Sequence, residues 1–234
     1  MTTHDLAFTF APPERPRVAV AGTNEWFPVH RIYCVGRNYA DHAREMGANP
    51  EREPPFFFAK PADAVVASGA TVAYPLATRN FHHEIELVVA VGREAVNLDR
   101  QAALDCVYGY AVGVDLTRRD LQLAARDGGR PWDAGKGFDQ SAPVTPIRRA
   151  TEVGHPVSGA IWLKVNEAVR QSADIAQLIW PVPDVLVHLS RLFVLKPGDL
   201  IYTGTPAGVG PLERGDRVTG GIAGIGEIAL TIGQ

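Results

Sequence analysis

The sequence predicts a strand-rich α+β fold with a few short helices. Glycine (23 residues) and proline (18) together exceed their usual share of a globular chain, so turns are over-represented among the 234 residues. Most apolar runs are short and are bounded by these turn residues, which is typical of short strands. Neither an internal repeat nor a linker divides the chain, and we expect one domain with an N-terminal arm and edge strands over residues 1–29.

In the first half of the chain, short strands alternate with turns. One helix is expected, over residues 37–46, with Gly47 as its C-cap. The predicted strands lie at 18–20, 26–29, 32–36, 54–61 and 84–91, with a turn and a weak strand between 62 and 80.

The second half begins with a short helix over 100–105 and a glycine-spaced strand over 107–115. An amphipathic helix follows over 116–126 and directs Leu121 and Leu123 toward the core, and residues 127–143 form a long loop. Asn166 and Glu167 form the turn of a β-hairpin. The remaining elements are a helix over 183–192, strands at 200–203, 216–218 and 227–232, and a glycine-rich turn over 204–210.

Composition excludes several classes of function. A net charge of −3 provides no basic face, so we expect no nucleic-acid partner and no membrane-surface binding. Apolar stretches fall short of the ~20 residues that span a bilayer, and the N-terminus lacks the features of a secretory signal. Cys34 and Cys106 lie in apolar runs without a C-x-x-C partner, which favours free thiols in a reducing cytoplasm.

An acidic motif, His82-His83-Glu84-Ile85-Glu86-Leu87, overlaps the start of the strand predicted over 84–91. Residues two apart on a strand share a face, so Glu84 and Glu86 project together and their charges repel each other. Asp115 ends another apolar strand and can join them. Three carboxylates suit Mg²⁺ or Mn²⁺, with Ca²⁺ as a further option, and do not suit zinc. The pattern also fits two surface acids on an edge strand, and it gives neither histidine a role as ligand.

His42 and Glu45 are three residues apart on the helix predicted over 37–46, so they share a face. A carboxylate beside an imidazole orients it and raises its basicity, which makes the pair a candidate general base for activating water. An exposed ion pair on a helix surface has the same spacing.

Cationic and polar residues that could bind anions lie after Asp115. Arg119 and Gln122 follow it at helical spacing, and Lys136 lies in the glycine-containing loop. Gly204 and Thr205 begin the glycine-rich turn, which is neither a P-loop nor a dinucleotide fingerprint but whose amides can hold an anion. Solvated surface charge is the alternative for these cations, and it is the interpretation we give to Arg118 and Arg126.

Taken together, these motifs resemble the fumarylacetoacetate hydrolase family. The matching segments are 33–39 with His42 and Glu45, 58–61, 82–87, 113–122, 134–139, 162–167 and 203–211. The resemblance implies a compact mixed β-roll or sandwich, with residues 30–234 as the catalytic domain and a homodimeric assembly. It also implies a metal on Glu84, Glu86 and Asp115. Members with a separate N-terminal domain have a fourth carboxylate at the position of Val35, so this chain resembles the short acylpyruvase-like branch.

The resemblance further implies metal-dependent cleavage of a carbon–carbon bond in a 2,4-diketo acid. In this hypothesis the keto-acid end of the substrate binds the metal, His42 and Glu45 activate water, and Lys136 with the metal holds the pyruvate enolate. Substrate-binding roles fall to Arg37, Lys60, Arg119, Gln122, Gly204 and Thr205. The helix at 42–46 and the loop after it are expected to act as a lid.

Fumarylpyruvate is the expected substrate, with Arg37 or Arg44 binding its second carboxylate. Fumarylpyruvate hydrolases of gentisate breakdown carry similar motifs. Two alternatives remain open from the sequence. The first is a metal-dependent oxaloacetate decarboxylase, or a related keto-acid isomerase, which needs no attacking water. The second is a non-catalytic binding module stabilised by Ca²⁺.

Overall fold

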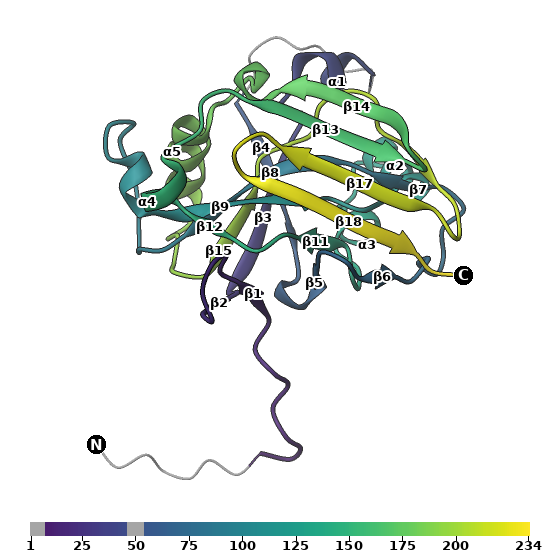
Figure 1. The fold of residues 1–234 in the computed structure, drawn as a ribbon, viewed down its shortest axis with the longest axis horizontal. Coiled ribbons are helices and arrows are strands. Elements are labelled where there is room, and N and C mark those ends of the chain that lie inside the picture. The colour runs from purple at the N-terminus through teal and green to yellow at the C-terminus, as the bar shows by residue number, and fades with distance from the viewer. Residues whose placement is uncertain (1–7, 46–53) are drawn as a thin grey trace.

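The computed structural model describes residues 8–45 and 54–234, and strands make up most of it (Figure 1). Within these residues the largest sheet has the strand order β4-β3-β15-β8-β9-β11-β5, and β12 pairs with β9. Its strands are β3 (Arg31–Gly36), β4 (Phe56–Lys60), β5 (Val65–Ala67), β8 (Ile85–Val91), β9 (Val107–Val114), β11 (Ala142–Val144), β12 (Arg148–Arg149) and β15 (Asp199–Tyr202). Most pairs are antiparallel, but β15 runs parallel to β3 and β11 runs parallel to β5. The predicted strand-rich α+β fold is confirmed.

A second sheet covers one face of the largest sheet (Figure 1). Its order is β14-β13-β17-β18-β6, and its strands are β6 (Thr71–Val72), β13 (Ala160–Val165), β14 (Ala168–Asp174), β17 (Arg217–Ile222) and β18 (Gly226–Ile232). Ile161 and Leu163 of β13 share an apolar core with Ile85 and Leu87 of β8. The main core therefore lies between the two sheets.

The opposite face of the largest sheet packs against the hairpin of β1 (Arg17–Ala19) and β2 (Trp26–Pro28). Val18 and Phe27 of this hairpin are buried in a second apolar cluster, with Val88 of β8 and Leu200 of β15. Residues 8–16 contain neither strand nor helix and lead away from the sheets (Figure 1).

Short elements complete the described parts of the chain. A small sheet has the order β10-β7-β16, formed by β7 (Phe81–His83), β10 (Thr117–Arg118) and β16 (Gly210–Leu212). The α-helices are α1 (Ala40–Glu45), α2 (Arg119–Asp127), α3 (Asp133–Lys136), α4 (Ala150–Val153) and α5 (Val182–Leu192). Single 3₁₀ turns are η1 (Ala62–Ala64), η2 (Ala103–Cys106) and η3 (Ile175–Gln177). None of the described helices is long and apolar enough to cross a membrane.

The alternation of side chains along β8 determines where the acidic residues point. Ile85, Leu87 and Val89 contribute to the core between the two sheets, whereas Val88 and Ala90 belong to the cluster on the opposite face. Glu84 and Glu86 have the same parity as Val88 and Ala90, so they face away from the main core, as the sequence predicts.

Several predicted elements are confirmed. The turn of the β13–β14 hairpin is Asn166-Glu167, and both residues have positive φ (49° and 66°), as a two-residue hairpin turn of the mirror-image type requires. The helix expected at 183–192 is α5, whose second residue is Pro183.

Other boundaries were wrong. The segment 100–105 forms only the 3₁₀ turn η2, and the loop over 127–143 contains the short helix α3 and the strand β11. The helix predicted over 37–46 begins at Ala40, because Arg37 has a φ of 56°, which an α-helix does not allow. Its predicted end at Met46 and Gly47 lies outside the described residues.

Candidate active site

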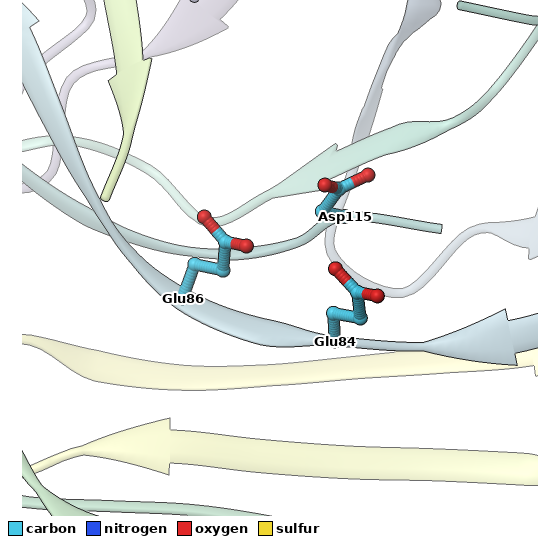
Figure 2. A group of neighbouring side chains, drawn as sticks. All are labelled: Glu84, Glu86 and Asp115. Atoms are coloured by element: carbon cyan, nitrogen blue, oxygen red, sulfur yellow. The ribbon is translucent and has the colours of Figure 1, made fainter. Parts of the chain in front are cut away.

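Three acidic side chains meet where two neighbouring strands of the largest sheet approach the small sheet. Glu84 lies between β7 and β8, Glu86 lies in β8, and Asp115 follows directly after β9. The backbone N–H of Asp115 donates to the carbonyl of Glu84 at 2.8 Å, which keeps the two strand ends together. Figure 2 shows the three carboxylates converging, and one oxygen of each lies within 4.8 Å of the others. All three are buried, with at most 4% of each residue exposed.

Cations surround two of these carboxylates. Lys136 Nζ donates to Glu84 Oε2 at 2.8 Å, to Asp115 Oδ2 at 2.6 Å and to the Thr117 hydroxyl at 2.7 Å. The Arg119 guanidinium contacts Glu84 Oε1. Burial alone would raise the pKa of Glu84, but Lys136 and Arg119 lower it well below its usual range, so this carboxylate is ionised.

Glu86 has a different environment. Burial raises the pKa of its carboxyl group well above the usual value, and the neighbouring charges of Asp115 and Glu84 raise it further. Its Oε2 accepts a hydrogen bond from the Gly204 amide at 2.7 Å, and no ion pair to Glu86 occurs among residues 8–45 and 54–234. Gly204 has a φ of 101° and a Cβ there would lie 2.7 Å from Asn38 Cβ, so glycine is needed for this approach.

The chemistry of this donor set fits a hard divalent cation. The three carboxylates offer only oxygen atoms, which Mg²⁺, Mn²⁺ and Ca²⁺ prefer, and at least one of them lacks a balancing positive charge. Glu84, Glu86 and Asp115 are therefore the residues that would hold a metal in this protein.

The His42–Glu45 pair lies on α1. His42 Nδ1 is 3.2 Å from Glu45 Oε2, and the backbone amide of Gly208 lies 3.3 Å from both oxygens of Glu45. The hydrogen bond with His42 lowers the pKa of Glu45; burial opposes this shift and the Gly208 amide supports it. The His42 residue is 6% exposed, whereas 35% of the Glu45 side chain is exposed, so the imidazole is buried and its carboxylate partner reaches solvent.

A small cavity of about 30 Å³ is lined by His42 and by the three acidic residues, whereas Glu45 does not line it. The predicted site residues that line it are Arg37, His42, Glu84, Glu86, Asp115, Arg119, Gln122, Lys136 and Thr205. Val35, the position at which the sequence lacks a fourth carboxylate, also lines it. The structure thus brings most of the sequence-predicted site residues to one place.

Comparison with known proteins agrees with this arrangement. Residues 31–233 match the family described as "Fumarylacetoacetate (FAA) hydrolase C-terminal". The chain belongs to the fumarylacetoacetate hydrolase family.

Three relatives illustrate the range of this family. The fumarylpyruvate hydrolase of Ralstonia sp is 48% identical to this chain, and the match covers 77% of this chain and 94% of the relative's length. The crystal structure of fumarylpyruvate hydrolase from Pseudomonas aeruginosa, in complex with Mn²⁺ and pyruvate, is 53% identical and covers 97% of this chain and 99% of its own, with a TM-score of 0.95. The mitochondrial oxaloacetate tautomerase FAHD1 of Bos taurus is 41% identical over 83% of this chain and 87% of its own.

Within this family site, Lys60 lies beneath the acidic residues and does not line the cavity. Its Nζ lies 2.8 Å from Asp115 Oδ1 and donates to the carbonyl groups of Leu116 (3.1 Å) and Lys136. The residue is 3% exposed. Its ammonium group holds Asp115 and the backbone around Lys136, and a contact between Lys60 and substrate stays a prediction.

The glycine-rich turn has partners within the protein. Its amides bind carboxylates of the protein itself, since Gly204 donates to Glu86 and Gly208 contacts Glu45. The Thr205 hydroxyl donates to the Ile85 carbonyl at 2.8 Å and accepts from Gln171 Nε2 at 2.8 Å. Binding of a substrate anion by Gly204 stays a prediction, since its amide donates to Glu86 here, and Thr205 can face the cavity only as a hydrogen-bond acceptor.

Helix α2 buries its polar side. Arg119 and Gln122 are its buried residues, whereas Leu121 and Leu123 are partly exposed, so the predicted inward orientation of the leucines was wrong. Arg119 donates to Gln122 Oε1 at 2.5 Å as well as contacting Glu84, because this side of the helix faces the site and not an apolar core. Gly135 permits α3 to approach α2, since a Cβ there would lie 2.8 Å from the backbone nitrogen of Gln122.

Sequence reasoning missed other residues of the site. Gln171 is fully buried in β14, and its Oε1 accepts from the Ile85 amide at 3.1 Å and lies 3.1 Å from His83 Nδ1. His83 is thereby held in the packing beside Glu84. Burial, with the charge of Arg119, lowers the pKa of His82 to about 4. The acidic group that could hold a metal contains neither histidine. A glutamine on an outer strand has no sequence signal that marks it as buried.

Proposed function

We propose that this protein is a divalent-metal-dependent hydrolase that cleaves fumarylpyruvate into fumarate and pyruvate. The observation that carries the proposal is one cavity lined both by the three carboxylates that could hold a metal and by His42, whose imidazole pairs with Glu45. Relatives with 48% and 53% identity are fumarylpyruvate hydrolases, and the second was crystallised with Mn²⁺ and pyruvate. Mn²⁺ or Mg²⁺ on Glu84, Glu86 and Asp115 is the cofactor we assign.

The reaction consumes one water molecule. Water adds to the acyl carbonyl of fumarylpyruvate, the bond between that carbon and the adjacent CH₂ breaks, and the acyl part leaves as fumarate. The electron pair stays on the CH₂ carbon, which becomes the enolate of pyruvate and then takes up a proton. The divalent cation, when bound, supplies Lewis acidity to the keto-acid end of the substrate.

His42 and Glu45 carry the proton transfer in this proposal. The imidazole takes a proton from the attacking water through Nε2, since Nδ1 lies 3.2 Å from Glu45. Glu45 holds the ring and compensates its positive charge, and the Gly208 amide fixes Glu45 in turn. The base is therefore positioned by two segments far apart in the sequence.

Lys136 and Gln122 act on the developing negative charge in different ways. All three N–H groups of Lys136 are directed at Glu84, Asp115 and Thr117, so it stabilises an enolate as a nearby positive charge. Gln122 Oε1 accepts from Arg119, which leaves its amide NH₂ to donate to a substrate carboxylate.

A second candidate function is conversion of oxaloacetate by decarboxylation or by a related isomerisation. The 41% identity to the bovine oxaloacetate tautomerase supports it. Such a reaction uses enolate stabilisation at the same carboxylate group but needs no water activated by His42. A non-catalytic Ca²⁺-stabilised module is the remaining alternative.

The test is turnover of fumarylpyruvate, acetylpyruvate and oxaloacetate with Mn²⁺, with Mg²⁺ and after treatment with EDTA. The proposal predicts one fumarate and one pyruvate for each fumarylpyruvate, and loss of this activity with EDTA. Turnover of oxaloacetate without hydrolysis of fumarylpyruvate would favour the second function. Inactivity toward all three substrates with either metal would favour the binding module.

We also propose that the protein acts as a homodimer in the cytoplasm, as the family resemblance implies. The two cysteines, both buried and free, agree with a reducing compartment. The mass in solution, measured by light scattering, tests the assembly.

A further inference from the structure

The polar side of α2 extends past the acidic residues toward the mouth of the cavity. Arg119, Gln122 and Arg126 all line the cavity, and their spacing of three and four residues places them on one side of the helix. The Arg119 side chain is 4% exposed and contacts Glu84, whereas the Arg126 side chain is 33% exposed. Arg126 therefore lies at the outer end, about 10 Å from Arg119 along the helix axis.

An aromatic wall borders the cavity: Phe58 and Trp132 line it, and with Phe56 they line a neighbouring open pocket of about 410 Å³. Lys136 Nζ is 5.1 Å from the ring centre of Phe58, and the Phe58 and Trp132 rings are 5.6 Å apart. Trp132 in turn packs edge-on against Phe56 at 5.2 Å, and the guanidinium carbon of Arg37 lies 5.6 Å from the Phe56 ring centre. This row of rings leads from Lys136 beside the acidic residues to Arg37.

Arg37 is held in an unfavourable backbone conformation. Its φ of 56° is rare for a residue with a Cβ, and such strain is often found at functional positions. Arg44, the other candidate for a distal anion, pairs with Asp41 at 2.5 Å, has a side chain that is 60% exposed, and does not line the cavity.

We infer that Arg126, together with Arg37, binds a carboxylate at the far end of the acyl group and so selects dianionic acylpyruvates. This inference rests on the proposed function and corrects our interpretation of Arg126 as solvated surface charge. The two carboxyl carbons of extended fumarylpyruvate are roughly 8 Å apart at ordinary carbon–carbon bond lengths, which agrees with the distance along α2. The flat, conjugated acyl chain then lies along the aromatic wall.

The ion pair between Arg126 and Asp127 does not oppose this role. Arg126 Nε and Asp127 Oδ1 are 2.9 Å apart, but the Asp127 side chain is 66% exposed, so the pair contributes little stability. A guanidinium group carries five N–H donors in a planar fork, and a carboxylate can bind to it through two of them. A substrate carboxylate would share the Arg126 guanidinium with its present partners, of which Asp127, contacted by both Nε and Nη2, is one.

The test compares Arg126→Met with the wild-type protein on fumarylpyruvate and on acetylpyruvate, whose acyl group carries no charge. Loss of a charge-assisted hydrogen bond should lower kcat/KM for fumarylpyruvate by about 10- to 100-fold, mainly through a higher KM. The value for acetylpyruvate should change less than about threefold, since that substrate lacks the second carboxylate. Arg130→Met is the matched control, because Arg130 is exposed and does not line the cavity, and it should leave both values unchanged.

An equal loss on both substrates, or no loss on either, would overturn the inference. Calorimetry separates this failure from failure of the proposed function. Fumarate titrated into protein saturated with Mn²⁺ and pyruvate should bind at least tenfold more weakly to Arg126→Met, with pyruvate affinity unchanged. If the wild-type protein hydrolyses neither substrate, the proposed function fails. Equal fumarate affinity in the wild-type protein and in Arg126→Met would refute the role of Arg126 independently of turnover.

Discussion

At the scale of single residues, the charges around the three carboxylates are unequal. Lys136 and Arg119 balance Glu84, and Lys60 with Lys136 balance Asp115. Glu86 accepts only the Gly204 amide among the contacts of the described residues. Glu86 is therefore the carboxylate without a positively charged partner among the described residues, and a divalent cation would supply that charge.

This environment predicts that metal binding releases a proton from Glu86. In the metal-free protein the pKa of Glu86 is raised by burial and by Asp115 and Glu84, so the carboxyl group holds its proton above the usual range. A bound metal needs the ionised form, so the affinity for Mn²⁺ should increase with pH until the metal-free protein has itself lost this proton. Calorimetric titrations in two buffers with different ionisation enthalpies measure the protons released, and affinity that is independent of pH without proton release would contradict this account.

Sequence analysis identified the acidic residues and the His42–Glu45 pair because strand and helix periodicities relate neighbouring positions. It could not identify the role of Lys60 or Gln171. Their functions depend on hydrogen bonds to residues more than 50 positions away, such as those between Lys60 and Lys136 and between Gln171 and Ile85. A local pattern of residue types contains no information about such contacts.

At the scale of elements, α2 shows why a helical pattern can mislead. The sequence contains leucines at positions 121 and 123, and burying apolar residues is the usual tendency of an amphipathic helix. Here the polar side is buried, because Arg119 and Gln122 contact each other and Arg119 contacts Glu84. The positions of α5 and of the β13–β14 hairpin could be predicted, but which side of α2 is buried depended on the charges opposite it.

The contact between α2 and α3 provides a prediction at this scale. Gly135→Ala places a Cβ 2.8 Å from the Gln122 backbone nitrogen and 2.9 Å from its Cα, so the two helices must separate. Lys136 is the next residue, and its displacement should lower kcat about tenfold or more, because small misplacements of catalytic groups are costly. Ala134→Ser is the control, since Ala134 is exposed on the same helix. Steady-state kinetics with Mn²⁺ tests the effect, and wild-type kcat in Gly135→Ala would contradict it.

At the scale of the whole molecule, the site depends on segments from both ends of the chain. α1 carries His42, the region around β8 and β9 carries the carboxylates, and the turn after β15 holds Glu45 and Glu86 through Gly208 and Gly204. The order of the motifs made the family and the strand-rich fold predictable. The pairing of β15 with both β3 and β8, which brings the turn to the site, has no local sequence signal.

The central claim is that His42 activates water beside a metal held by Glu84, Glu86 and Asp115. Measuring kcat of His42→Ala on fumarylpyruvate at saturating Mn²⁺ tests it most directly, with His155→Ala as a control that removes an imidazole outside the cavity. We predict a decrease of about 10²- to 10⁴-fold with unchanged Mn²⁺ affinity and an unchanged melting temperature. Hydrolysis by His42→Ala at the wild-type rate would contradict the claim.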